Sequence, residues 1–97
     1  MLKASEAMAI TISIIEARME MGKTKAHNSI ESIEMVIRYD AEKGLNNTVI
    51  YPLRMYDFDS DEERRAYIKE LTKILADNGY KISYNTANRS MKISWGF

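Results

Sequence analysis

The chain has 97 residues, which allows a single domain, because a typical domain needs about 100 to 200 residues and a second core would be too small. A hydrophobic content of 45% and a charged content of 29% exclude a disordered or fibrous chain. The 14 basic and 14 acidic residues cancel, so no overall field points to nucleic acid or an anionic membrane. The chain has no cysteine, which excludes disulfides, thiolate metal sites and cysteine nucleophiles.

No apolar run approaches the roughly 18 residues of a membrane span. The first residues also lack the basic, apolar and cleavage regions of a signal peptide. We therefore expect a cytoplasmic protein that does not engage a membrane.

Apolar and small residues recur every three or four positions through the N-terminal half, which predicts one helix from about residue 5 to residue 43. Ser5 is the expected N-cap, and Lys43 with Gly44 is expected to end the helix. The residues of this stripe are Met8, Ile12, Ile15, Met19, Gly22, Ala26, Ile30, Ile33 and Ile37.

Two other interpretations of this half remain open. Ile10, Ile12 and Ile14 alternate with polar residues, as a short strand would. A helix over residues 5–43 would also be about 58 Å long, whereas a compact domain of this size is only about 33 Å across. Either the helix breaks near Gly22, with Asn28 capping a second helix, or its apolar stripe extends onto another chain. The unbroken phase of the stripe favours one long helix.

The second half predicts a strand, a helix and a hairpin. Alternating residues predict a strand over 49–56, with Pro52 at an edge or bulge because it has no N–H. Ser60 and Glu63 form a capping box that opens a helix ending at Gly79. Its expected buried stripe is Tyr67, Ile68, Leu71, Ile74 and Leu75. Two alternating segments over 80–84 and 91–97 then predict the hairpin.

The predicted fold class is α+β, with a long N-terminal helix followed by a β-α-β-β unit over about residues 48–97. A right-handed crossover through the second helix leaves the last strand between the other two, in the antiparallel order 1-3-2. Both helices are expected to cover the one apolar face of this sheet.

Motifs that carry chemistry are incomplete in this sequence. Asp57, Asp59 and Asp61 resemble the start of a calcium loop, but Glu62 and Ile68 replace the required glycine and glutamate. The single histidine lacks the partners of a ligand set or a proton relay, and the segment Gly-Lys-Thr over 22–24 lacks the earlier glycine of a phosphate loop. We expect no catalytic residues, no cofactor and no metal.

Arg65, Lys69 and Lys73 form a basic edge on the second helix and are a possible anion-contacting site. Such a stripe is more often a solvated face, and here Glu62 and Glu70 interrupt it. Nucleic acid is an unexpected partner, because the aromatic residues that would stack on bases lie mainly on the strands.

Seven methionines are unusual for this length, and several lie on or near the long helix. Flexible, polarizable methionine side chains suit adaptable contact surfaces. Together with the length of the helix, they predict a surface for a protein partner and a homo-oligomer. The expected partner-binding residues are Met8, Ile12, Ile15, Met19, Ala26, Ile30 and Met35.

The chain combines a long amphipathic helix, a strand and a capped helix with the segments Asn78-Gly79-Tyr80-Lys81-Ile82 and Ile93-Ser94-Trp95. This layout resembles that of small accessory proteins of tailed bacteriophages. This resemblance implies virion assembly or interference with a host or defence factor, and it carries over no functional residues. It places the protein in the cytoplasm of the host cell, or in the virion.

Three functions follow as hypotheses. The first is a non-catalytic interaction module that self-associates through its long helix and binds or blocks a host or defence factor. The second is a structural or assembly component of the virion head or tail. The third is a small nucleotide-binding or hydrolytic enzyme, which would need a site that the motifs do not provide.

Overall fold

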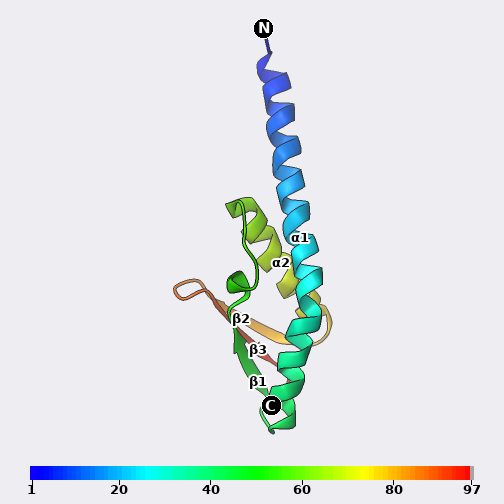
Figure 1. Ribbon diagram of the computed structural model, residues 1–97, viewed down its shortest axis with the longest axis vertical. Helices are drawn as coiled ribbons and strands as arrows, with labels where there is room; N and C mark the ends of the chain where they lie inside the picture. Colours follow the sequence, from blue (N-terminus) through cyan, green and yellow to red (C-terminus); the bar gives the residue numbers. More distant parts are fainter. Residues whose placement is uncertain (97) are drawn as a thin grey trace.

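The computed structural model describes residues 1–96. The protein consists of one long helix and a smaller body, which contains a second helix and a three-stranded sheet (Figure 1). This arrangement confirms the predicted α+β fold class. The position of Phe97, which the sequence places at the end of the last strand, lies outside the described residues. In chain order, the elements are α1 (Ala4–Glu42), β1 (Asn47–Ile50), the 3-10 turn η1 (Pro52–Arg54), α2 (Asp61–Asp77), β2 (Lys81–Asn85) and β3 (Ser90–Ser94).

Helix α1 is unbroken over 39 residues, which confirms the long helix and overturns both the break near Gly22 and the short strand. Its N-cap is Lys3 and no side chain caps it, so the prediction for Ser5 is wrong. Its C-terminus follows the prediction, because Gly44 adopts a φ of +85° and the N–H of Leu45 reaches the carbonyl of Asp40 at 3.1 Å.

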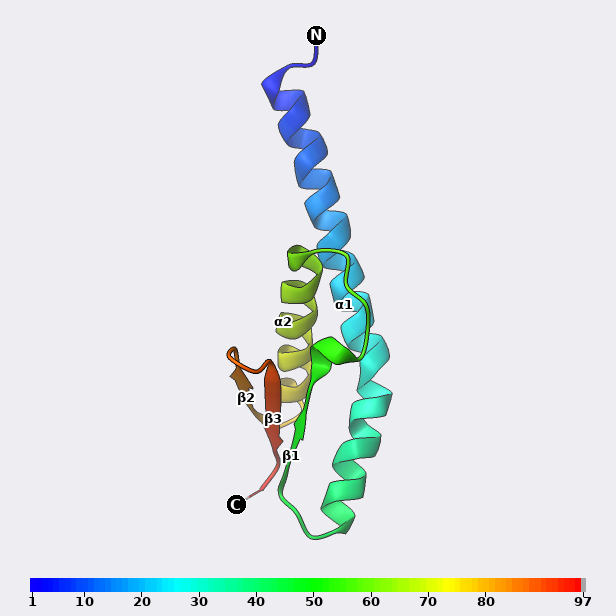
Figure 2. The same ribbon diagram turned by 60° about the vertical axis from the view of Figure 1, so that its left-hand side comes forward.

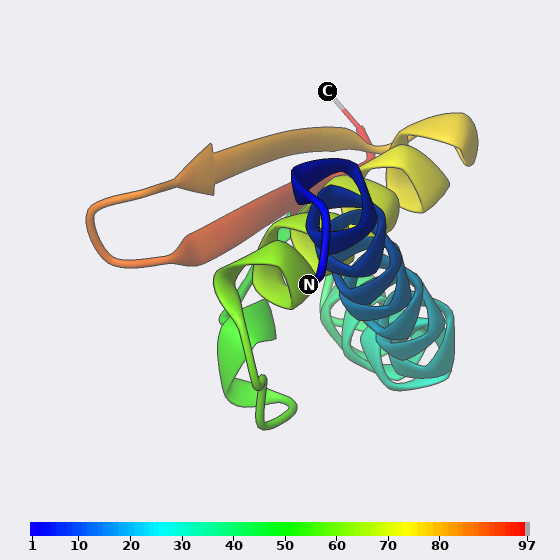
Figure 3. The ribbon, with the colours of Figure 1, turned by 90° about the horizontal axis from the view of Figure 1, so that it is seen from above.

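The sheet has the predicted order β1-β3-β2, and both pairings are antiparallel. In Figure 3 both helices lie on the same side of the sheet. The side chains that face them are buried or half-buried, and those on the opposite face are mostly polar and exposed. The inward-facing residues are Thr48, Ile50, Ile82, Tyr84, Met91 and Ile93.

The first strand is shorter than predicted. It ends at Ile50, and the chain turns into η1 at Pro52, where the prediction continued the strand to residue 56. Proline cannot donate a ladder hydrogen bond and its φ suits the start of a 3-10 turn, which explains the early end. Pro52 follows an edge strand, in agreement with the predicted edge position.

Helix α2 begins at a capping box whose second half differs from the prediction. The hydroxyl of Ser60 accepts the N–H of Glu63 at 3.2 Å, as expected. The carboxylate of Glu63, however, accepts the N–H of Asp59 at 3.1 Å, one residue before the cap. The helix ends as predicted, with Gly79 at a φ of +91°. Its buried apolar residues are Ala66, Tyr67, Leu71 and Leu75, whereas Ile68 and Ile74 are half-buried.

The two helices run side by side in the same direction (Figures 1 and 2), and they are in close contact at Gly22. A Cβ atom on Gly22 would overlap the carbonyl oxygen of Glu63 and would lie 3.0 Å from the Cβ of Ala66. Below this contact, Tyr67 is fully buried, and its ring centroid lies 4.9 Å from that of Phe58. The absence of a side chain at residue 22 therefore allows α2 to pack directly against α1.

The close approach at Gly22 predicts that Gly22→Ala lowers the free energy of unfolding. Overpacking costs about 1 to 3 kcal/mol, and the better helix propensity of alanine returns about 1 kcal/mol. We expect a net loss of about 1 kcal/mol in urea unfolding followed by circular dichroism. Ser13→Ala, on an exposed part of the same helix, is the matched control and should change stability by less than about 0.5 kcal/mol. A stabilised Gly22→Ala variant would contradict the close contact.

Candidate functional site

The first 18 residues of α1, from Ala4 to Met21, project from the body of the protein, with only the last turn beside the start of α2, and we call this segment the arm (Figure 2). All of its residues are exposed except Ile15, which is half-buried. The molecule measures 65 × 24 × 21 Å with a radius of gyration of 16.6 Å, whereas a compact domain of this size has about 12.5 Å. The chain's own residues therefore leave the arm uncovered.

One row of large apolar side chains runs along the arm, consisting of Met8, Ile12, Ile15 and Met19. Met8 is 58% exposed, Ile12 47% and Met19 41%. The spacing of the row alternates between four and three residues and continues through Gly22, Ala26, Ser29 and Ile33, which are buried. We call this whole heptad-spaced face the seam. Its lower half is filled by α2, and its upper half is open.

Residue size changes along the seam at the point where α2 begins. Gly22, Ala26 and Ser29 are small, and there α2 lies close to the α1 backbone. Above them, the seam carries only methionine and isoleucine. Large side chains without a neighbour are typical of a surface that another helix covers.

The predicted partner-binding residues separate into three groups in the structure. Met8, Ile12, Ile15 and Met19 lie together on the open seam. Ala26 is fully buried in the core, and Ile30 is half-buried against it, so these two lie outside the exposed arm. Met35 is 68% exposed but lies on another face of α1, beside Glu31, Arg38 and Tyr39.

The sequence prediction missed a second apolar row on the arm. Ile10, Ile14 and Met21 are 56%, 48% and 45% exposed, and with Ala17 they show the same spacing of four and three residues. Each helical residue advances by about 100°, so this row lies roughly opposite the seam. The spacing of four and three residues could have revealed this row from the sequence. The row was missed because Ile10, Ile12 and Ile14 alternate with polar residues, which is also the pattern of a strand.

A buried ion pair fixes the direction of the arm at its base. The Nζ of Lys25 donates to the Glu63 carboxylate and, at 2.8 Å, to the carbonyl of Asp57. The Glu63 side chain is fully buried and that of Lys25 is 23% exposed. A more exposed pair, Arg18 with Glu62 at 3.7 Å, joins the same two helices about two turns higher. These contacts hold the arm in line with α2.

The pKa of Glu63 reflects the balance of burial against these contacts. Burial alone would raise the pKa, because it disfavours a charged carboxylate. The hydrogen bonds from Lys25 and from the N–H of Asp59, with the positive charges of Lys25 and Arg64, outweigh this effect and lower the pKa of Glu63. The ion pair therefore stabilises the fold while the carboxylate is ionised.

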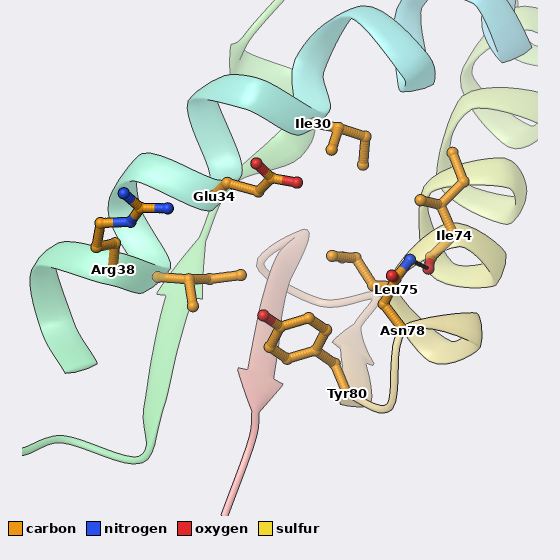
Figure 4. Close-up of a pocket in the computed structure, with 8 residues that line it drawn as sticks. Ile30, Glu34, Arg38, Ile74, Leu75, Asn78 and Tyr80 are labelled. Atoms are coloured by element: carbon orange, nitrogen blue, oxygen red, sulfur yellow. Dashed lines mark hydrogen bonds between the residues drawn. The ribbon is translucent and has the colours of Figure 1, made fainter.

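A groove lies between the lower end of α1 and the end of α2 (Figure 4). It has a volume of about 470 Å³ and is open to solvent. Glu34 and Arg38 on α1 line one side of it and Asn78 and Tyr80 line the other, and the Asn78 amide donates to the Ile74 carbonyl at 2.7 Å. These side chains do not form a nucleophile and base pair.

The remaining sequence candidates lie apart from each other. Arg65, Lys69 and Lys73 are all exposed on α2, where the first two border a shallow apolar groove of about 300 Å³. His27 is exposed on α1. Within residues 1–96, no three His, Cys, Asp or Glu side chains are placed to hold a metal ion. No helix in that range combines the length and the apolar character needed to cross a membrane.

Comparison with known proteins found no matching family model, no similar curated protein and no solved structure of similar fold.

The buried ion pair predicts a pH-dependent cost for Lys25→Met. At pH 7 the variant leaves a buried carboxylate without its partner, which should lower the free energy of unfolding by about 3 kcal/mol. Because the folded pKa of Glu63 lies below its ordinary value of 4.5, the stabilisation is present above pH 4.5 and is lost as the pH falls through the folded pKa. The difference between the variant and the wild type in free energy of unfolding should therefore become smaller as the pH falls from 7 to 3.

Urea unfolding at several pH values measures this difference. Lys23→Met removes an exposed lysine two residues away and is the matched control, with a small effect at every pH. A Lys25→Met variant that is as stable as the control at pH 7 would show that the pair does not contribute to the fold.

Proposed function

We propose that this chain is a non-catalytic interaction protein that self-associates through the open half of the seam. The supporting observation is the exposure of Met8, Ile12 and Met19 on a face that packs against a helix lower down. Contiguous apolar patches of this kind on a small protein mark an interaction site. A second copy supplies a matching surface, because identical chains commonly pair through the same patch.

The composition of the arm supports protein contact over contact with lipid or nucleic acid. One side of the arm carries Glu6, Ser13, Glu16 and Glu20, which keeps a solvated face outside a helical assembly. Acidic residues on that face are unfavourable next to phosphate groups. The methionines of the seam can adapt their shape to a neighbouring helix.

The assembled protein acts by occupying the surface of another protein. The resemblance to small accessory proteins of tailed bacteriophages supports a host or defence factor as that target. The second apolar row, with Ile10, Ile14 and Met21, is the part of the arm that stays available when the seam is covered. Binding through such a surface requires no catalytic residue, cofactor or metal.

Self-association predicts a molar mass above the 11.2 kDa of one chain in size-exclusion chromatography with light scattering. The measurement should cover about 1 to 200 μM, which spans the affinity expected for a small interface. Ile12→Glu places a charge on the seam and should return the mass to 11.2 kDa. At a protein concentration where the wild type is also a single chain, the two thermal unfolding midpoints should be similar, because Ile12 lies outside the core.

Ser13→Glu adds the same charge on the solvated side of the arm and is the matched control. It should keep the wild-type mass. A wild-type protein that stays at the mass of one chain over the whole concentration range would refute self-association.

A further inference from the structure

We infer that two copies pair their arms antiparallel, each arm lying on the open seam of the other. This inference rests on the proposed self-association and adds its direction and its extent. It follows from the position of α2, which covers the same seam from Gly22 downward. Any helix on the open seam must therefore fit above the first turn of α2.

A parallel pair conflicts with the position of α2. Packed helices lie about 8 to 10 Å apart, so two arms in contact would bring both α1 axes to that distance. Below Gly22 each seam already holds its own α2, and both α2 helices would have to lie between the two α1 helices. To make room for both α2 helices, the distance between the two α1 axes would have to grow by at least two helix diameters, or about 20 Å. Because α1 is unbroken through Gly22, it cannot diverge sharply at that point.

An antiparallel pair avoids this conflict, because each α+β body then lies beyond the far end of the other copy's arm. The ion pair between Arg18 and Glu62 shows that the first turn of α2 reaches the level of Arg18. The second arm can therefore overlap about residues 4–18, which is about four turns. In this overlap, Met8 of one copy lies near Ile12 and Ile15 of the second copy. Both halves of the contact are built from the same apolar row.

Charge favours the same arrangement where the end of one arm meets the start of α2. Lys3 of the second copy comes close to the acidic segment before and at the start of α2, which contains Asp57, Asp59, Asp61 and Glu62. Two helix N-termini approach each other at this point, and each carries a partial positive charge. The carboxylates of α2, and Glu6 in the first turn of α1, offset that repulsion.

Spin labels on single cysteines test the direction, since the chain has no cysteine of its own. Ala9→Cys lies near the middle of the overlap and Lys23→Cys lies at the base of the arm, and both positions are exposed. At 1.5 Å per residue, an antiparallel pair separates the two residue 9 positions by about 6 Å along the axis and the two residue 23 positions by about 36 Å. Pulsed electron resonance should therefore give a short distance, below about 20 Å, at residue 9 and a distance near 40 Å at residue 23.

Dilution with unlabelled protein is the control and should remove both distances. Short distances at both positions would overturn the antiparallel direction while leaving self-association intact. No dipolar coupling at either position, together with the mass of one chain in light scattering at the same concentration, would refute the proposed function as well. Ser13→Glu, labelled at residue 23, should keep the long distance, and Ile12→Glu should lose it.

Discussion

The close contact between Gly22 and the backbone of α2 determines the architecture of this protein. It lets two helices of 39 and 17 residues pack side by side from the first turns of α2. Because the first turn of the shorter helix lies beside Arg18, the part of α1 before that residue is left largely exposed. The buried pair of Lys25 and Glu63 lies one turn below and fixes the angle at which the longer helix leaves the body. The exposed arm is thus a direct result of where α2 starts.

The seam carries one sequence pattern through a half that is covered and a half that is open. Its heptad spacing is the same on both sides of Gly22, but three of the four residues in the covered half, Gly22, Ala26 and Ser29, are small. Small residues let helix backbones approach closely, whereas methionine and isoleucine fill a wider gap between helices. The lower half is therefore suited to a partner fixed by the chain itself. The upper half is suited to a helix that arrives from elsewhere.

Much of the fold follows from local sequence patterns, and the differences have physical causes. The stripe from Met8 to Ile37 predicts α1, because helical periodicity is a local property that needs no tertiary information. The early end of β1 depends on the turn that Pro52 makes, which alternating hydrophobicity does not reveal. Ala26 appears on the predicted partner face because periodicity identifies a buried side of a helix without indicating what covers it.

The interactions at the base of the arm were beyond sequence reasoning for a different reason. Lys25 and Glu63 are 38 positions apart, and nothing in their local patterns links them. The capping box identifies Glu63 as a residue that reaches back at a helix start, but it does not show that the side chain is buried beside another helix. The second apolar row was missed because alternation over Ile10, Ile12 and Ile14 fits both a strand and two faces of a helix.

The run from Ile10 to Ile15 has one further consequence for the arm. Five of its six residues are β-branched, and such side chains lose rotamer freedom in a helix and are weak helix formers. In most proteins this cost is balanced by burial of the same side chains, but here they are largely exposed. In the proposed pair, contact with the second arm would bury these side chains and so stabilise the helix of each arm. By mass action, the fraction of arms stabilised in this way would rise with the concentration of the protein.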